Sequence, residues 1–178
     1  MNLIIDVGNT RIKAAVFEND KLIDVSVFNE ELLIEKIDFL ISKFNLKRGI
    51  ISSVKEISNK TLIELQGKLF FLILDSNTKV PFVNLYKTPK TLGVDRIALV
   101  ANAVEKFSNQ NALIIDAGTC ITFDFVNTKK EYLGGAISLG IEMRYTSLNT
   151  YTSKLPYLEK KIPENFVGKT TEENIHSG

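Results

Sequence analysis

Leu3-Ile4-Ile5-Asp6-Val7-Gly8-Asn9-Thr10 recurs later in the chain as Leu113-Ile114-Ile115-Asp116-Ala117-Gly118-Thr119-Cys120. In both copies an apolar segment of strand type leads into Asp-x-Gly, and a hydroxyl-bearing residue follows. Two further strand-like segments come after each copy, at 11–17 and 21–28 in the first and at 121–126 and 132–137 in the second. The repeat therefore predicts two domains, each of which opens with a three-stranded meander whose first turn carries Asp-x-Gly.

The rest of the first copy alternates between helical and strand periods. We expect a helix at 30–44, a strand at 48–54, a helix at 59–67, a strand at 68–75, a loop at 77–92 and a helix at 93–107. This order predicts an α/β fold with a mixed sheet flanked by helices.

The second copy follows the same order as far as a helix at 139–148. A further helix is expected to begin at Thr170, because Glu173 stands at capping-box spacing from it. We predict domains at 1–108 and 109–178. A second domain of matching size would need roughly 60 more residues, so we expect a C-terminally truncated chain with an incomplete second domain.

The composition is that of an ordinary globular protein, with 44% hydrophobic and 24% charged residues in a chain of 178. A formal net charge of +1 gives no electrostatic case for wholesale binding to nucleic acid or an anionic membrane. One cysteine and one histidine exclude a disulfide framework and a multi-cysteine zinc site, and argue against a Ser-His-Asp triad. With neither a signal-peptide pattern nor an apolar run of ~18 residues, the sequence predicts a cytoplasmic protein without a membrane span.

The Asp-x-Gly turns have the chemistry of a phosphate site. Glycine permits close approach and a positive φ, and successive amides of such a turn can form an anion-binding nest. Asp6 cannot bind phosphate directly, so its expected role is to hold Mg²⁺, through water. Lys13 could reach a β- or γ-phosphate. One copy alone would more simply be a tight hairpin, but two copies favour phosphate binding.

Three other segments leave alternatives open. Asp95, in Gly93-Val94-Asp95-Arg96, could be a general base or simply a carboxylate favoured by the helix dipole, and spacing alone favours the latter. Gly134-Gly135 could allow close backbone approach or mark a bulge. Gly168-Lys169-Thr170 imitates a P-loop but lacks the strand and the earlier glycine, so that reading is rejected. His176 is expected to be solvated near a frayed end.

The motifs together resemble those of type III pantothenate kinases, in the acetate and sugar kinase/Hsp70/actin superfamily. The resemblance covers essentially the whole chain and is carried by segments that occur in the family's order: Asp6-Val7-Gly8-Asn9-Thr10 with Lys13, Gly93-Val94-Asp95-Arg96, Asp116-Ala117-Gly118-Thr119, Gly134-Gly135-Ala136-Ile137, Lys154-Leu155-Pro156 and Gly168-Lys169-Thr170-Thr171. It implies two ribonuclease H-like domains with mixed five-stranded sheets.

The resemblance also implies an activity, the transfer of the ATP γ-phosphate to pantothenate in the first step of coenzyme A synthesis. Mg²⁺ would accompany ATP, Asp95 would be the catalytic base, and Asp116 would coordinate a monovalent cation, K⁺ or NH₄⁺. Members of the family are homodimers. The ATP phosphates would be bound by Asp6, Val7, Gly8, Asn9, Thr10, Arg11, Ile12, Lys13 and Thr119. Pantothenate would be contacted by Tyr86, Gly93, Val94, Asp95, Arg96 and Thr171.

Two alternatives to this activity have different sequence requirements. A non-catalytic regulatory or binding protein on the same fold would not need Lys13, Asp95 and Asp116 together, and all three are present. A kinase of another small hydroxy compound is disfavoured only through the resemblance at 93–96. The chain departs from the family at Leu139-Gly140, where Pro-Gly is usual, which concerns the shape of one turn.

Overall fold

The computed structural model describes residues 1–178, and contacts divide them into two compact units. The first comprises residues 1–112 and 125–134, and the second comprises residues 113–124 and 135–178. No helix in either unit is both long and apolar enough to cross a membrane.

The first sheet has five strands in the order β3-β2-β1-β4-β5. Their bounds are β1 (Asn2–Val7), β2 (Ile12–Glu18), β3 (Lys21–Phe28), β4 (Arg48–Ser53) and β5 (Phe71–Ile73). The first three strands pair antiparallel, whereas β4 pairs parallel with β1 and β5 parallel with β4. The predicted meander and mixed five-stranded sheet are therefore confirmed for the first copy.

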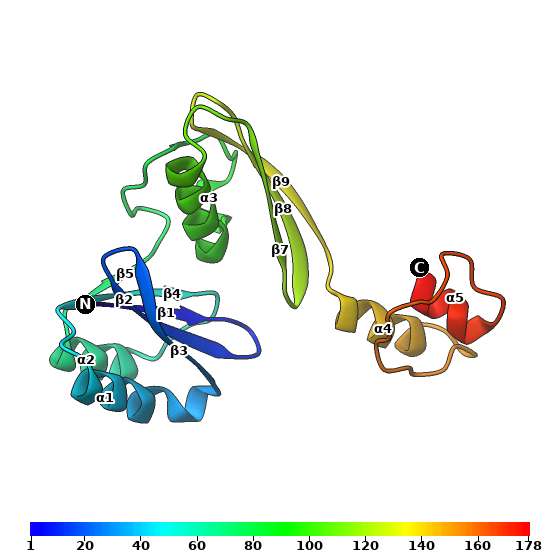
Figure 1. Ribbon diagram of the computed structural model, residues 1–178, viewed down its shortest axis with the longest axis horizontal. Helices are drawn as coiled ribbons and strands as arrows, with labels where there is room; N and C mark the ends of the chain where they lie inside the picture. Colours follow the sequence, from blue (N-terminus) through cyan, green and yellow to red (C-terminus); the bar gives the residue numbers. More distant parts are fainter. The chain divides into compact units, whose positions relative to one another are not determined.

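One face of this sheet is covered by helices α1 (Leu33–Lys43) and α2 (Asn59–Lys68) (Figure 1). A 3₁₀ turn, η1 (Glu30–Leu32), precedes α1, and the Ser58 hydroxyl caps α2 by accepting from the amide of Thr61. Alternate side chains of β1 and β2 are buried against the helices because strand residues two apart share a face. The core between the sheet and these helices is formed by Leu3, Ile5, Val7, Ile12, Ala14, Val16, Phe28, Leu33, Ile37, Leu40, Ile51, Leu65 and Phe71.

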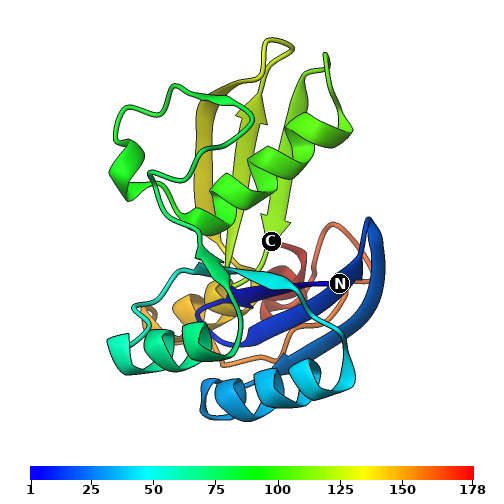
Figure 2. The same cartoon turned by 90° about the vertical axis from the view of Figure 1, so that its left-hand side faces the viewer.

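The segment between β5 and α3 (Val94–Lys106) runs from the end of the first sheet to the start of α3 (Figure 2). The sequence predicted it as a loop, but it contains a two-residue strand, β6 (Val83–Asn84), and a 3₁₀ turn, η2 (Pro89–Thr91). β6 pairs parallel with β9 (Glu131–Leu139). Because two residues are too few to show a hydrophobic period, no strand could be predicted here.

A second sheet has the order β6-β9-β8-β7, in which β7 is Ala112–Ala117 and β8 is Cys120–Val126. The predicted second meander is present, but the sheet has four strands and its fourth comes from the earlier loop. The helix expected at 139–148 is α4 (Ile141–Thr150), which starts later because β9 continues through Leu139.

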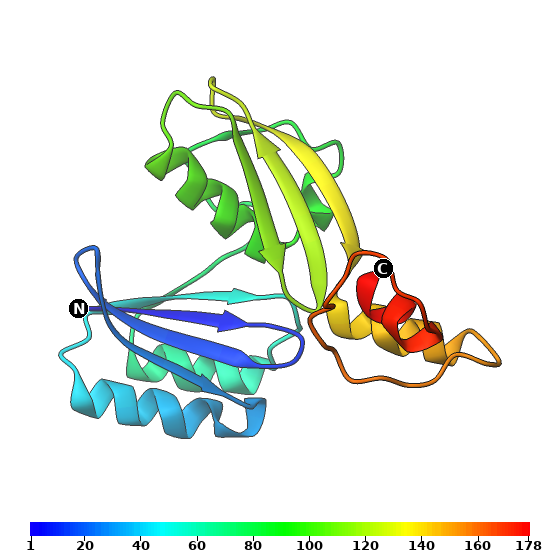
Figure 3. The same cartoon turned by 45° about the vertical axis from the view of Figure 1, so that its right-hand side comes forward.

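Helix α5 (Thr171–Ser177) lies beside α4, with the loop between them passing around the pair (Figure 3). Arg144 donates from Nη2 to the Ile175 carbonyl at 2.6 Å, and the Tyr145 hydroxyl lies 2.7 Å from His176 Nδ1. The expectation of a solvated His176 is therefore wrong, because its side chain is only 7% exposed. A lone histidine two residues from the chain end carries no periodic signal that would have predicted this packing.

Candidate active site

The first Asp-x-Gly turn connects β1 to β2, and its two outermost apolar residues belong to the core. Val7 and Ile12 are each 2% exposed, so only their backbones could face a ligand. The amide of Gly8 donates to the Arg11 carbonyl at 3.1 Å, and a Cβ on Gly8 would lie 3.0 Å from that oxygen. Glycine is needed here for close approach and not for a positive φ, which among the glycines only Gly134 adopts.

Polar groups of this turn face solvent. Asn9, Thr10 and Arg11 are exposed, and Lys13 Nζ lies 3.9 Å from Asp6 Oδ2. The Gly8 amide is engaged within the turn. The turn thus combines the amide side chain of Asn9, a hydroxyl, two cationic side chains and one carboxylate.

The second Asp-x-Gly turn, between β7 and β8, belongs to the other unit and is closed by a bond that spans one residue fewer. Here the Gly118 amide donates to the Cys120 carbonyl at 2.9 Å, while Asp116 and Thr119 are exposed. Gly140 packs against this turn by donating its amide to the Thr119 carbonyl at 3.1 Å, and a Cβ on Gly140 would collide with that same oxygen. Gly140, which follows the position at which the chain departs from the family, is therefore in direct contact with the second turn.

Asp95 lies in the first turn of α3, after Gly93 as N-cap residue. Its Oδ1 accepts a hydrogen bond from the Arg96 amide at 2.8 Å, and a Cβ on Gly93 would collide with the same oxygen. Glycine at 93 therefore makes room for the Asp95 carboxylate, which is half-buried. An oxygen held in this way at a helix start can accept a proton from a bound hydroxyl.

Arg96 is buried, with 5% of its surface exposed, and it lies beside Tyr86. Its guanidinium carbon is 5.7 Å from the Tyr86 ring centroid, within the range of a cation–π contact. Nη2 donates to the Tyr132 hydroxyl at 2.9 Å. The structure thus brings two predicted pantothenate contacts together and adds Tyr132, which was not predicted. The aromatic residues show no periodicity in the sequence that singles it out.

Thr171 is the first residue of α5 and is exposed. The helix start is fixed by the preceding residue, since Thr170 Oγ1 accepts from the Glu173 amide at 3.1 Å. The Glu173 carboxylate accepts in turn from the Lys169 amide at 2.6 Å, one residue before the cap. The predicted helix start is confirmed, but the Glu173 carboxylate accepts from the Lys169 amide and not from the amide of the cap residue Thr170.

A hollow in the second unit is lined by residues 161–165 and by Gly168, Glu173 and His176. It contains none of the predicted site residues.

The donor set suits some metals and not others. Residues 1–178 contain no cluster of three or more histidine, cysteine, aspartate or glutamate side chains that could hold a metal ion. Mg²⁺ needs no such cage, because it keeps several waters and binds through one or two carboxylates and the substrate phosphates. The exposed carboxylate of Asp6 beside an exposed polar turn fits that mode of binding.

Comparison with known proteins supplies the family. The family model described as type III pantothenate kinase matches residues 2–178. The chain belongs to the type III pantothenate kinase family. Relatives named type III pantothenate kinase include those of Flavobacterium johnsoniae, 43% identical, and Christiangramia forsetii, 46% identical. Each match covers 100% of this chain and 73% or 74% of the relative.

A solved structure agrees on the fold. It is described as a conserved candidate Baf family transcriptional activator from Campylobacter jejuni, and it matches 98% of this chain and 72% of its own with a TM-score of 0.62 at 20% identity. Membership of the family makes this chain a kinase that phosphorylates pantothenate with ATP, in coenzyme A biosynthesis. The reaction requires a divalent metal.

Proposed function

We propose that the chain forms 4'-phosphopantothenate with Asp95 as the general base. The substrate hydroxyl would lose its proton to the Asp95 carboxylate while its oxygen forms a bond to the γ-phosphorus, and the bond from that phosphorus to ADP breaks. The observation that carries this role is the start of α3, where Gly93 leaves room for an oxygen of Asp95 and the Arg96 amide holds that oxygen at 2.8 Å. Phosphoryl transfer needs mainly such positioning and neutralisation of charge.

We propose that residues Asp6–Lys13 bind the ATP phosphates, with Thr119 as a further contact. The exposed cations Arg11 and Lys13 support this role, because phosphate is anionic. Mg²⁺, held through water by Asp6, would neutralise the phosphate charge. Asp116 would coordinate K⁺ or NH₄⁺, which its position in the matching second turn supports.

The acceptor pantothenate would be held by Tyr86, Gly93, Val94, Arg96 and Thr171. Pantothenate carries a carboxylate, and a guanidinium can bind a carboxylate through two parallel hydrogen bonds. The position of Arg96 beside Tyr86, with its guanidinium carbon 5.7 Å from the ring centroid, supports this assignment because it groups two of these residues.

We also propose the domain boundaries and the oligomeric state. Domains at 1–108 and 109–178 would each be built on one copy of the repeat. The meander β7–β9, which repeats the order of β1–β3 around a second Asp-x-Gly turn, supports the second of these domains. From the family and the net charge of +1 we infer a cytoplasmic homodimer that binds neither nucleic acid nor membrane.

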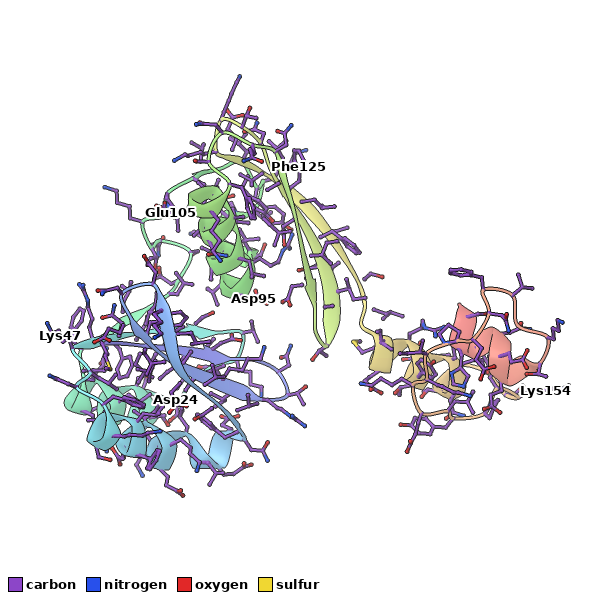
Figure 4. The ribbon with its side chains drawn as sticks, viewed as in Figure 1. Asp24, Lys47, Asp95, Glu105, Phe125 and Lys154 are labelled. Atoms are coloured by element: carbon purple, nitrogen blue, oxygen red, sulfur yellow. The ribbon has the colours of Figure 1, made fainter.

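The deciding experiment measures ADP release by the protein with ATP, Mg²⁺ and K⁺, with and without pantothenate. Asp95→Asn should lower kcat about 10²–10⁴-fold, the usual contribution of a general base. Glu105→Gln is the matched control, because Glu105 is an exposed carboxylate at the other end of α3 (Figure 4). Absence of pantothenate-dependent release by the wild type would refute the activity, whereas an active Asp95→Asn variant would refute only the role of Asp95.

A further inference from the structure

Tyr132 is the largest side chain that is fully buried, with 0% of its surface exposed. A buried phenol is stable only when its hydroxyl has a hydrogen-bond partner. Here the hydroxyl accepts from Arg96 Nη2 at 2.9 Å. Complete burial excludes direct contact with a substrate, so any effect of Tyr132 on substrate must pass through its neighbours.

The ring of Tyr132 also positions the ring of Tyr86. The two rings are stacked, with centroids 6.1 Å apart and planes inclined by 25°. Phe82 packs edge-on against Tyr132, with a centroid separation of 6.0 Å. Tyr132 therefore contacts, through different atoms, both of the side chains that form the Arg96–Tyr86 pair.

The backbone of Tyr132 fixes the segment from which Tyr86 projects. Asn84 of β6 pairs with Tyr132 of β9, and the Leu85 amide donates to the Tyr132 carbonyl at 3.0 Å. Two residues further along β9, Gly134 adopts φ +110°, and a Cβ there would lie 3.5 Å from the Tyr86 ring. The chain thus brings β9 against Tyr86 at two successive points.

We propose that Tyr132 is a positioning residue for the acceptor substrate. Its hydroxyl fixes the direction of the Arg96 guanidinium, while its ring and carbonyl fix Tyr86, so that both are preorganised to receive pantothenate. This inference rests on the proposed roles of Arg96 and Tyr86. Preorganisation of this kind strengthens binding by removing the cost of ordering the site when the ligand enters.

The test is Tyr132→Phe in the full chain, since phenylalanine keeps the ring and removes only the hydroxyl. KM for pantothenate should rise about tenfold, the scale of one hydrogen bond to a charged group. KM for ATP and kcat should stay within about twofold, because the bond is lost at the acceptor side alone. Calorimetric titration with pantothenate should show the same weakening without turnover. Tyr151→Phe, at a tyrosine that is 85% exposed, is the matched control and should change none of these values.

A double-mutant cycle shows whether the effect passes through Arg96. In an Arg96→Met background, Tyr132→Phe should raise the pantothenate dissociation constant less than about twofold further. An unchanged KM for pantothenate in Tyr132→Phe would overturn the inference while the kinase activity of the wild type stands. Equal losses for pantothenate, ATP and kcat together with a lower Tm would also overturn it, because they would indicate a purely structural role. A wild type that neither binds nor phosphorylates pantothenate would refute the proposed function and this inference with it.

Discussion

Asp6 and Lys13 are direct partners across the antiparallel strands β1 and β2, and their charged groups lie 3.9 Å apart on either side of the first Asp-x-Gly turn. Both side chains are well exposed, at 42% for Asp6 and 65% for Lys13. An exposed ion pair contributes little to stability, so this one is not needed to hold the hairpin together. The strand register instead fixes a cation and a carboxylate at one position beside a turn that we assign to ATP.

Substitution of this pair should change the use of ATP and leave folding intact. Lys13→Met should raise KM for ATP about tenfold, the scale of one charge-assisted hydrogen bond, and Asp6→Asn should raise the Mg²⁺ concentration needed for half-maximal rate. Steady-state rates against ATP and Mg²⁺ test the two effects, and Tm should not move. Lys43→Met is the control, because it breaks a comparable ion pair with Asp24 at 2.9 Å. Lower Tm values with unchanged kinetics would assign the pair to the fold.

Gly93→Ala tests whether the Asp95 carboxylate needs the space that glycine leaves. The added methyl would collide with Asp95 Oδ1, and a side-chain rotation relieves that collision more readily than a backbone shift. The helix should therefore persist while kcat falls at least about tenfold, the cost of misplacing a catalytic group. Circular dichroism and kcat measured on one preparation separate the two effects. Full activity of the variant would show that the observed carboxylate position is not required.

Asp116→Asn should abolish stimulation of the rate by K⁺ or NH₄⁺. Asparagine has nearly the same shape but lacks the negative charge that favours a bound cation. Rates measured against increasing KCl, with choline chloride holding ionic strength constant, should rise for the wild type and stay flat for the variant. Equal stimulation of both proteins would place the monovalent cation at other residues.

Two glycine-to-alanine substitutions should have opposite signs. Gly140→Ala would drive a methyl group into the Thr119 carbonyl and should cost about 1–3 kcal/mol, as overpacking does. Gly67→Ala in α2 meets nothing within 4 Å and should stabilise by up to about 1 kcal/mol through helix propensity. Urea denaturation measures both changes. A weaker affinity for ATP in Gly140→Ala alone would connect the second turn to the nucleotide.

The loss of folding stability at acidic pH should depend in part on Asp75. The Thr78 hydroxyl donates to Asp75 Oδ1 at 2.8 Å, and this bond lowers the pKa of the carboxyl below its ordinary value of 3.8. A carboxyl whose pKa is lower in the folded state stabilises the fold above its unfolded pKa and loses that contribution as pH falls through the folded pKa. Thr78→Val should therefore be less stable than wild type at pH 7, and the difference should shrink below about pH 4. A difference that is constant across this range would contradict the assignment.

The sequence predicted those parts of the fold that have a period or a repeat. β1 is an apolar run, β2 alternates, α1 and α3 show helical spacing, and Asp6 and Asp116 are matched by the repeat itself. By contrast, β6 is too short for a period, and Tyr132 and His176 are buried by contacts with residues distant in sequence. Such packing follows from tertiary structure and leaves no local pattern.

Candidate residues of the active site divide in the same way. The repeat and the family motifs single out Asp6, Asp95 and Asp116, because their chemistry lies in short segments. These segments do not show which distant residues contact them. Gly140 donates to the Thr119 carbonyl, and the Tyr132 hydroxyl accepts from Arg96. These supporting contacts join separate strands and helices, so only the folded chain reveals them.

Amide exchange in the two-residue strand β6 can be used to measure binding at the acceptor site. The strand pairs with β9 at Val83 and Asn84 alone, and the amides of Val83 and Leu85 donate to the carbonyls of Lys130 and Tyr132. So short a ladder opens at low cost, and its amide protons should exchange with deuterium much faster than those of β1. Pantothenate bound beside Tyr86 should slow exchange at Leu85 selectively. Occupancy of the acceptor site could then be followed by mass spectrometry or NMR, one proton at a time and without any turnover.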